Sequence, residues 1–514
     1  TTGPCDPARH YMLPAGRRLP DLRRLVEREQ YFVLHAARQV GKTTAMRAFA
    51  EELRAAGYVA VHASLETSQG AEAVEEAEPR WLGAIASYAE VLAPELRPPP
   101  WTTAAGAFPE GGRLQGWLGQ WSAAVAPRSV VLLLDEADTV SGPALVNLLR
   151  QLRSGFNQRP GRFPASVGLI GMRDLRDYLT ESKDGVPVNP GSPFNIKAAS
   201  ITMRNFTAAE VVELVSQHTG DTGQVFTPAA SARLFEWTAG QPFLVNALAL
   251  CCMDDLCPDR AVAVTAEHVD EAKERLVLAR TTHLDALAER LKEPRVARVV
   301  EAVLLGDEPR SVDPTTDDFR YVVDLGLVVV GPMGPEPANR MYREVLLREL
   351  SRAEQSAIPA PWWRWARPDG RLDYPALVEA FRGYWREHAD VIAEHMPLYP
   401  EAVTHVAFMA FLQRVVNGGG HVEREFAAGR GAVDVVTHYA GERFVTEIKR
   451  VRERDSLDTV KDRGVAQLGR YLGTLGMTEG WLLVVDQRAG RSWDDRLWLE
   501  TRVVDGRTLH LVGV

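Results

Sequence analysis

A short apolar run leads directly into a loop that contains glycine and lysine, and this junction limits the possible folds more than any other feature of the chain. Tyr31 to His35 predicts a buried strand, and Thr43 to Ala56 predicts a helix that Gly57 ends. The connecting loop carries Gly41 and Lys42 at its end. Backbone N–H groups of such a loop, together with a helix N-terminus, bind phosphate oxygens. Strand, phosphate-binding loop and helix in succession are the building unit of a parallel α/β sheet.

The loop follows the pattern G-x-x-x-x-G-K-[ST], except that Ala36 stands where the first glycine is expected. Lys42 supplies positive charge for the β- and γ-phosphate oxygens, and Thr43 supplies a hydroxyl for Mg²⁺. One extra methyl group at the start of the loop tightens the turn but need not block the phosphates. The residues expected to contact the nucleotide are Ala37, Arg38, Gln39, Val40, Gly41, Lys42, Thr43 and Thr44.

A second apolar run, Val130 to Leu134, brings two carboxylates, Asp135 and Glu136, to the end of a predicted strand. In nucleotide hydrolysis a carboxylate here holds Mg²⁺ through water, which we expect of Asp135, and Glu136 would polarise the attacking water. Tyr58 to Ala63 and Ser166 to Ile170 have the apolar density of further interior strands. An acidic turn after a strand is common by itself. Together with the loop upstream, it predicts that ATP and Mg²⁺ bind at the carboxyl edge of the sheet.

These residues resemble the AAA-like and STAND-type P-loop ATPases of prokaryotes, over about residues 8 to 350. The resemblance also rests on three downstream segments, Gly171 to Tyr178, Gly191 to Ile196 and Gly240 to Asn246. It implies an ATPase core followed by a helical lid and a winged helix. It also implies self-assembly on activation, although no heptad pattern supports this in the sequence itself.

The same resemblance implies roles for three further residues. Arg173 matches a residue that follows the sensor strand and reaches the terminal phosphate, Pro242 matches a lid proline near the base, and Tyr11 lies in a segment near the adenine. The structural alternatives are an ion pair of Arg173 with Asp174 or Asp177, and a simple helix start at Pro242.

A second group of residues able to do chemistry lies near the C-terminus. Asp434 is followed 13 residues later by Glu447-Ile448-Lys449. Period-two alternation puts Glu447 and Lys449 on one face of a strand, and a hairpin around Tyr439 to Gly441 would place Asp434 beside Glu447. Two carboxylates and a lysine bind a hard divalent ion, orient a water and offset transition-state charge. The alternative for the tripeptide alone is an ordinary solvated strand face.

The next predicted helix carries Gln467 and Tyr471 four residues apart, and therefore on one face. This arrangement, in the predicted order α-β-β-β-α-β, resembles the PD-(D/E)xK nuclease superfamily over about residues 400 to 490. The resemblance implies Mg²⁺-dependent cleavage with Asp434, Glu447, Lys449, Gln467 and Tyr471 in the catalytic site. The further acidic metal ligand of the superfamily matches Glu425 best, with Glu401 and Glu423 as alternatives.

The charge distribution adds a hint about the partner. The formal net charge is -9, yet Arg443 to Arg470 contains 8 basic and 5 acidic residues. A locally positive strip in an acidic protein favours a polyanionic partner, although an ordinary solvated face explains the charge equally well. We expect a nucleic acid, DNA before RNA, with Lys461 among the residues near enough to contact phosphates.

Composition bounds the remaining possibilities. The chain has 514 residues, which is too long for one hydrophobic core, and it is 46% hydrophobic, which excludes a disordered protein. Its longest uncharged apolar run, Phe243 to Met253, has 11 residues, against about 20 for a membrane span. The first residues show no secretory leader, and the four cysteines contain no C-x-x-C pair. We therefore expect a cytoplasmic protein without a membrane partner.

The predicted fold class is a multidomain α/β protein. Pro94 to Gly112, rich in proline and glycine, predicts a loop, and the segment around Ile358 predicts a linker. The domains expected are a P-loop ATPase core at 1–205, a helical lid at 206–283, a winged helix at 284–356, a linker and helical connector at 357–395, and a restriction-endonuclease-like nuclease domain at 396–514.

The function that best joins these features is an ATP-dependent switch that controls a Mg²⁺-dependent endonuclease, as in prokaryotic defence or conflict systems. That setting is an analogy between domain combinations. One alternative is a regulatory ATPase whose C-terminal domain binds nucleic acid or a partner protein without cutting. Another alternative is a nuclease of DNA repair or junction processing.

Overall fold

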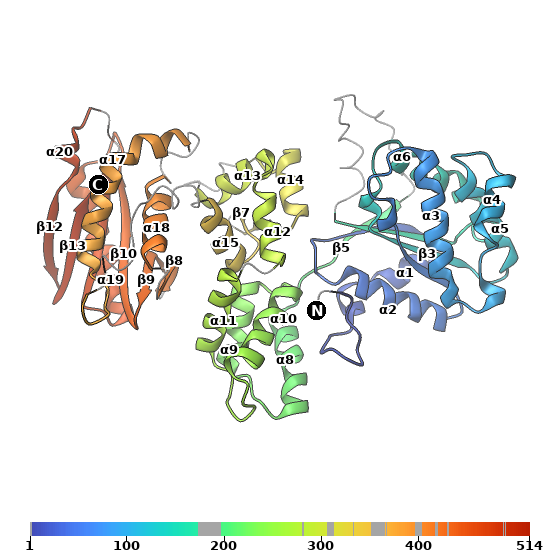
Figure 1. Cartoon of the computed structure of the whole chain (residues 1–514), viewed down its shortest axis with the longest axis horizontal. Coiled ribbons are helices and arrows are strands. Elements are labelled where there is room, and N and C mark those ends of the chain that lie inside the picture. The colour runs from blue at the N-terminus through green and yellow to red at the C-terminus, as the bar shows by residue number, and fades with distance from the viewer. Residues whose placement is uncertain are drawn as a thin grey trace. The chain divides into compact units, whose positions relative to one another are not determined.

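The computed structural model describes residues 3–172, 197–279, 282–305, 313–332, 334–350, 365, 367–395, 403–416, 420–428, 431–486, 488 and 490–514 (Figure 1). The chain divides into two compact units, and each is described by itself. The first comprises Thr1–Leu276, Pro314–Val329 and Ala338–Arg340. The second comprises Val277–Asp313, Val330–Pro337 and Met341–Val514.

The first unit contains a parallel sheet of five strands in the order β2-β3-β4-β1-β5. The strands are β1 (Tyr31–His35), β2 (Val59–Ser64), β3 (Val130–Asp135), β4 (Ser166–Gly171) and β5 (Lys197–Thr202). This topology confirms the predicted P-loop α/β fold and the four strands expected from the apolar runs. Because all strands run the same way, the loop after β1 and the carboxylates after β3 emerge at one edge of the sheet.

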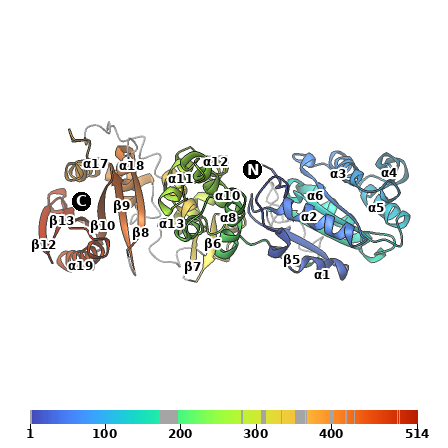
Figure 2. The ribbon, with the colours of Figure 1, turned by 90° about the horizontal axis from the view of Figure 1, so that it is seen from below.

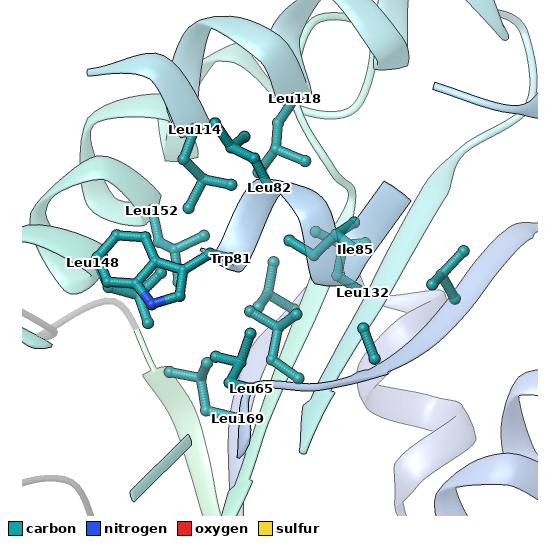
Figure 3. Close-up of a cluster of buried hydrophobic side chains, with 14 of the residues drawn as sticks. Leu65, Trp81, Leu82, Ile85, Leu114, Leu118, Leu132, Leu148, Leu152 and Leu169 are labelled. Carbon is teal, nitrogen blue, oxygen red and sulfur yellow. The ribbon is translucent and has the colours of Figure 1, made fainter. Parts of the chain in front are cut away.

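Alternate residues of each strand serve two separate cores. Tyr31 and Val33 of β1 pack with helices α3, α5 and α6, whereas Phe32 and Leu34 pack on the other face with α1 and α2. Figure 3 shows part of the first core, where Trp81 lies among leucine side chains from neighbouring helices and strands. Covering the sheet on both faces explains why its strands are continuous apolar runs.

The helices of this α/β part are η1 (Ala15–Arg18), α1 (Leu22–Glu27), α2 (Lys42–Ala55), η2 (Glu66–Ser68), α3 (Val74–Tyr88), η3 (Ala89–Val91), η4 (Pro94–Leu96), α4 (Trp101–Ala107), α5 (Arg113–Ala124), η5 (Ala137–Thr139), α6 (Gly142–Gly155) and η6 (Phe156–Gln158). The prediction of a loop from Pro94 to Gly112 was wrong, because η4 and α4 lie within this segment. Trp101 starts α4 and packs against the core, and this burial outweighs the local proline and glycine content.

A helical region follows β5, and its elements are α8 (Ala208–Thr222), α9 (Pro228–Thr238), α10 (Pro242–Leu250), the π-helical turn η7 (Cys251–Leu256) and α11 (Ala266–Leu278). Next come α12 (Thr282–Arg290), α13 (Pro294–Leu305), α14 (Asp317–Asp324), β6 (Val328–Gly331), β7 (Gly334–Pro337) and α15 (Arg340–Leu350). β6 and β7 form a two-stranded sheet. Helices followed by a two-stranded ribbon and a helix are the element order expected of a winged helix.

The second unit contains a mixed sheet of six strands in the order β12-β13-β11-β10-β9-β8. Its elements are α17 (Tyr374–His395), α18 (Val403–Val416), β8 (Gly420–Ala428), β9 (Gly431–Tyr439), β10 (Glu442–Val451), α19 (Leu457–Leu475), β11 (Glu479–Asp486), α20 (Trp493–Arg496), β12 (Leu499–Val504) and β13 (Arg507–Gly513). The stretch from α18 to β11 has the predicted order α-β-β-β-α-β.

Helices cover both faces of this sheet as well. Ile448 and Trp481 pack with α17 and α18, whereas Val445 and Leu482 pack with α19 on the opposite face. Figure 2 shows α17 and α18 on one side of the strands and α19 on the other.

None of the helices in the described part of the chain combines the length and apolar character that crossing a lipid bilayer requires.

Candidate functional site

The loop between β1 and α2 turns the chain from the sheet edge into a helix. Ala36 still belongs to the sheet, because its N–H donates to the carbonyl oxygen of Gly171 at 3.3 Å. Gly41 precedes α2 with φ 98°, a left-handed conformation that glycine adopts without strain. Gln39 also has a positive φ, 58°. The resulting curl ends at the N-terminus of α2, which is the geometry of a phosphate site.

The ammonium group of Lys42 lies within this loop. Its Nζ atom donates to the carbonyl oxygens of Ala36 at 2.7 Å and Ala37 at 3.0 Å. Burial lowers the pKa of Lys42, and the nearby carboxylates, Glu136 foremost, oppose that shift. The loop therefore holds a buried positive charge beside the helix N-terminus, as a phosphate site requires.

Asp135, at the end of β3, accepts three hydrogen bonds. Thr43 Oγ1 donates to Oδ2 at 2.8 Å, His62 Nε2 lies 3.0 Å from the same oxygen, and the N–H of Glu136 donates to Oδ1 at 3.0 Å. Burial acts to raise the pKa of Asp135, but these hydrogen bonds, that of His62 foremost, lower it below its ordinary value. The structure thus brings together Thr43 and Asp135, the two residues predicted to hold Mg²⁺.

The next two acidic positions differ in their surroundings. Burial first, and then the charges of Asp138 and Asp135, raise the pKa of Glu136. Glu136 also has φ 54°, an unusual backbone conformation that turns the chain sharply after β3. Asp138 Oδ2 accepts the N–H of Met172 at 3.2 Å and so connects the turn after β3 to the end of β4. A carboxyl group with a raised pKa at this edge suits the role predicted for Glu136, which is to polarise the attacking water.

The segment before β1 contacts the loop and α2. Arg18 is buried, and its NH1 donates to the carbonyl oxygens of Val40 at 2.8 Å and Arg204 at 3.2 Å. Burial lowers the pKa of Arg18 to about 10. Nearer the N-terminus, the N–H of Cys5 donates to Thr44 Oγ1 at 3.1 Å. The predicted nucleotide-binding residues Val40 and Thr44 are therefore held from outside the loop.

The residues inferred from the ATPase resemblance have different outcomes. Tyr11 packs edge-on against His218 of α8, with ring centroids 5.8 Å apart. Pro242 is the first residue of α10, which matches the helix-start alternative. The residue that reaches the loop is its neighbour Gln241, whose Nε2 makes a long hydrogen bond of 3.5 Å to the carbonyl oxygen of Arg38. Arg173 lies outside the described residues.

Sequence reasoning missed three contributors to this site, namely His62, Arg18 and Gln241. His62 gave a usable signal, because it is the polar residue inside the apolar run of β2, the strand next to β3. A buried imidazole in such a run needs a partner, and Asp135 provides it. Arg18 and Gln241 gave no signal, since their contacts join segments far apart in the sequence.

In the second unit, a tight hairpin joins β9 to β10. Its turn residues Ala440 and Gly441 have φ 48° and 80°, which suits a two-residue turn between antiparallel strands. The pairing of β9 with β10 runs from Glu442 opposite Tyr439 to Thr446 opposite Val435, and continuing it by one residue sets Glu447 opposite Asp434. Asp434 Oδ2 accepts the N–H of Ile448 at 2.7 Å. The hairpin therefore places the two predicted carboxylates side by side.

Glu447 is fully buried, and its two oxygens differ. Oε1 accepts a hydrogen bond from Lys449 Nζ at 2.6 Å, whereas Oε2 is buried without a hydrogen-bond partner among the residues the structure describes. Burial first, and then the charge of Asp434, raise the pKa of Glu447 to about 7, against the opposing effect of Lys449. An orphaned carboxylate oxygen beside a second carboxylate fits a cation between them.

The structure does not connect Gln467, Tyr471 and Lys461 to the two carboxylates by hydrogen bonds among the described residues. Gln467 Nε2 donates to Tyr471 Oη at 3.0 Å on α19, the helix that covers the Glu447 face. In the described part of the chain their side-chain hydrogen bonds reach each other and not the carboxylates. Lys461 packs over the Trp498 ring at 3.6 Å and pairs with Glu500, which makes it a structural residue.

The third acidic ligand is not located. Glu425 lies on β8, but its side chain is outside the described part, as are the side chains of the alternatives Glu401 and Glu423. Within the ranges that the structure describes, no group of three or more His, Cys, Asp and Glu side chains is placed to hold a metal ion. Asp434 and Glu447 are the carboxylates that the structure brings together.

Comparison with known proteins gives one family match, which lies in the first unit, and several similar solved structures. Residues 24–179 match the family model of an AAA domain. A Walker-type ATPase of Pyrococcus abyssi is similar in structure, with TM-score 0.49, 14% identity, and 67% of this chain and 99% of that chain covered. The Thermotoga maritima RuvB Holliday junction branch migration motor is similar with TM-score 0.34, 16% identity, and 64% and 92% covered.

No curated protein matches the sequence of this chain. The AAA match spans the loop after β1 and the carboxylates after β3, so the family model and the site geometry concern the same residues. This part of the chain is an AAA-type P-loop ATPase domain. ATP is accordingly the ligand expected at the loop.

Proposed function

We propose that the chain is an ATP-controlled nuclease. In this proposal the AAA-type domain binds and hydrolyses ATP with Mg²⁺, and the second unit cleaves a nucleic acid with its own divalent ion. The observation that carries the nuclease half is Glu447, a buried carboxylate beside Asp434 with one oxygen paired to Lys449 and the other oxygen without a hydrogen-bond partner among the described residues. Such a group is costly to bury unless a cation completes it.

In the ATPase half, Mg²⁺ bound with ATP would supply positive charge against the negative charge that develops on the phosphates. The loop N–H groups and Lys42 hold phosphate oxygens at the N-terminus of α2. Thr43 and Asp135 would supply a hydroxyl and a carboxylate to the ion, and the hydrogen bond from His62 keeps Asp135 in place. Glu136 accepts a proton from water, which its raised pKa favours.

In the nuclease half, a bound divalent ion would supply a Lewis acid for the scissile phosphate and for the attacking water. Asp434 and Glu447 would hold that ion, and the raised pKa of Glu447 means that binding releases a proton near neutral pH. Lys449, anchored on Glu447 Oε1, is placed to orient the water or offset transition-state charge. Gln467 and Tyr471 on α19 would contact the nucleic-acid backbone from the same face.

A switch suits the chain better than a motor, because its lid and winged-helix regions resemble STAND regulators. By the same analogy we place it in prokaryotic defence or conflict, with DNA rather than RNA as substrate and assembly on activation. The positive strip at Arg443 to Arg470 supports a polyanionic substrate.

The test is a cleavage assay with the purified full chain. Linear and branched DNA and RNA are incubated with Mg²⁺ or Mn²⁺, with and without ATP, and ATP turnover is measured in the same samples. We expect metal-dependent cleavage that Asp434→Ala and Lys449→Ala abolish while ATP turnover persists. Asp462→Ala, an exposed carboxylate of α19, is the matched control and should cut like the unaltered protein.

Three results would change the proposal. Binding of nucleic acid without cleavage under all conditions would favour the regulatory ATPase with a binding domain. Cleavage confined to branched DNA would favour a junction-processing enzyme. Unchanged cleavage in both Asp434→Ala and Lys449→Ala would remove the site from the second unit.

A further inference from the structure

The outer strand of the second sheet, β12, has an open edge. Among the described strands only β13 pairs with it, in antiparallel register from Leu499 opposite Val512 to Val504 opposite Arg507. The connecting turn, Asp505 and Gly506, has φ 48° and 73°. A two-residue turn of this kind sets the register of the whole hairpin.

The register also fixes which backbone groups face outward. The carbonyl oxygen of Trp498 accepts a hydrogen bond from the N–H of Gly513 at 2.9 Å, so the backbone polar groups of Trp498 point toward β13. Because these groups alternate along an antiparallel strand, the N–H and C=O groups of Leu499, Thr501 and Val503 point away from β13. They form a row of donors and acceptors along the open edge.

The side chains of this strand divide in the same way. Leu499 and Val503 are 62% and 72% exposed, although both are apolar. Glu500 and Arg502 instead turn toward α19, where they pair with Lys461 and Asp462. The strand also contains no proline or lysine, the residues that proteins commonly use to protect an edge from pairing.

We propose that β12 is a self-association surface, on which β12 of a second copy of this chain pairs antiparallel about a two-fold axis at Thr501. In this register Leu499 faces Val503 of the second copy, and Thr501 faces Thr501. Every facing pair of outward residues exchanges two main-chain hydrogen bonds. The two sheets become one continuous sheet, and the exposed apolar side chains pack across the junction.

The charged residues of β12 favour a second copy of β12 as the partner, and they favour the register with its axis at Thr501. With the axis at Thr501, Glu500 of each copy lies opposite Arg502 of the other. An axis at Glu500 would oppose two glutamates, and an axis at Arg502 would oppose two arginines, which is destabilising across paired strands. The strand is therefore complementary to itself in the one register that also pairs its two apolar side chains.

One consequence rests on the proposed nuclease function, whereas the interface itself does not. β12, β13, β11 and β10 are consecutive strands, so seven strand spacings separate β10 from its copy. At about 4.8 Å each, the two Glu447 sites lie at most about 34 Å apart along the joined sheet. That span is close to one turn of duplex DNA.

The test uses two charge variants of the full chain and measures molecular mass by light scattering in the absence of nucleotide. Leu499→Lys/Val503→Lys places lysine opposite lysine, and Leu499→Glu/Val503→Glu places glutamate opposite glutamate. We expect each variant alone to have half the mass of the unaltered protein. An equimolar mixture should regain the full mass, because lysine then faces glutamate at both positions.

The control is Val225→Lys/Val330→Lys, since these valines are 50% and 64% exposed and lie outside β12. It should retain the mass of the unaltered protein. The mixture guards against misfolding, since misfolded chains would not reassociate. An unaltered protein that stays a single chain at high concentration, variants that keep its mass, or a mixture that does not reassociate would each overturn the proposal. None of these outcomes depends on whether the protein cuts nucleic acid.

Discussion

Two buried carboxylates, Asp135 in the first unit and Glu447 in the second, stand in opposite situations. Asp135 accepts hydrogen bonds from Thr43, His62 and a backbone N–H, and its pKa is lowered. Glu447 accepts one from Lys449, leaves Oε2 without a partner among the described residues, and has a pKa raised to about 7. Hydrogen-bond donors of the protein stabilise the charged form of Asp135, whereas Glu447 needs a proton or a bound cation.

Because of this contrast, the two sites would respond differently to a bound ion. The Asp135 site is held in place by the protein before a nucleotide arrives, so the fold itself preorganises it. The Glu447 site would gain stability on binding a cation, because the ion replaces a proton and removes a repulsion from Asp434. The two sites should therefore respond differently to substitution, pH and added metal ions.

Replacing Lys42 or Lys449 by alanine should separate ATP turnover from nucleic-acid cleavage most clearly. Lys42→Ala should lower ATP turnover by at least about 100-fold, because it removes the charge at the phosphate loop. Lys449→Ala should lower cleavage by a similar factor and leave ATP turnover intact. Both rates are measured on each variant. Loss of ATP turnover in Lys449→Ala would mean that the two sites are not separate.

The stability of the metal-free protein should depend on Glu447 and pH. The folded state keeps a proton that the unfolded chain releases between the ordinary pKa of 4.5 and the folded pKa of about 7, so stability falls as pH rises through that window. The loss above pH 7 is on the order of 3 kcal/mol. Glu447→Gln should abolish this dependence, as followed by denaturant unfolding at several pH values.

Glu442→Gln is the control, because Glu442 begins the same strand near the surface. It should keep the pH dependence. Added Mn²⁺ should restore the stability of the unaltered protein at pH 8 but not that of Glu447→Gln. An unchanged slope in Glu447→Gln would contradict the contrast with Asp135.

Helix α19 packs closely against Lys449 at Gly464, and a substitution there tests this packing. A Cβ on Gly464 would lie 2.7 Å from the δ-carbons of Leu482 and 3.2 Å from Cγ of Lys449. Gly464→Ala should therefore destabilise the protein by about 1–3 kcal/mol and displace Lys449. Gly469→Ala on the same helix has open space and should stabilise it by about 0.5–1 kcal/mol. Equal effects in thermal unfolding would contradict the packing described for α19.

Removing His62 should have the smallest effect. His62→Ala takes away a hydrogen bond that lowers the pKa of Asp135, so about 1 kcal/mol of stability should be lost at neutral pH. That contribution is present above the unfolded pKa of Asp135 and disappears as pH falls through the lower folded pKa. Unfolding at pH 7 and at pH 3 measures the difference.

His510→Ala, which removes an exposed pair with Glu479, should change neither value by more than a few tenths of a kcal/mol through that pair. A loss in His62→Ala that is equal at both pH values would contradict the account of Asp135.

The sequence predicted the parts of the molecule where the pattern is local. The strands of the parallel sheet are continuous apolar runs, and the β9–β10 hairpin follows from period-two alternation around Tyr439 to Gly441. The same logic placed Asp434 beside Glu447. It failed at Pro94 to Gly112, where Trp101 and its neighbours form α4 against the core despite local residues that favour a loop.

Contacts between distant segments were mostly beyond sequence reasoning, since the place of His62 in an apolar run indicates a buried partner but does not identify it. His62 reaches Asp135 only because β2 and β3 are neighbours in the sheet, and Gln241 reaches Arg38 across 203 residues. The structure shows that Pro242 starts α10, and its place near the base, which the resemblance implies, stays a prediction. The burial that raises the pKa of Glu447 likewise depends on α19 covering β10, which no local pattern reveals.

The central claim is that Asp434 and Glu447 form a cation site separate from the ATP site. Calorimetric titration of Mn²⁺ into the nucleotide-free protein measures it directly. The account predicts binding that releases protons near neutral pH, that disappears in Glu447→Gln and that persists in Lys42→Ala. Binding that survives in Glu447→Gln, or none in the unaltered protein, would contradict it.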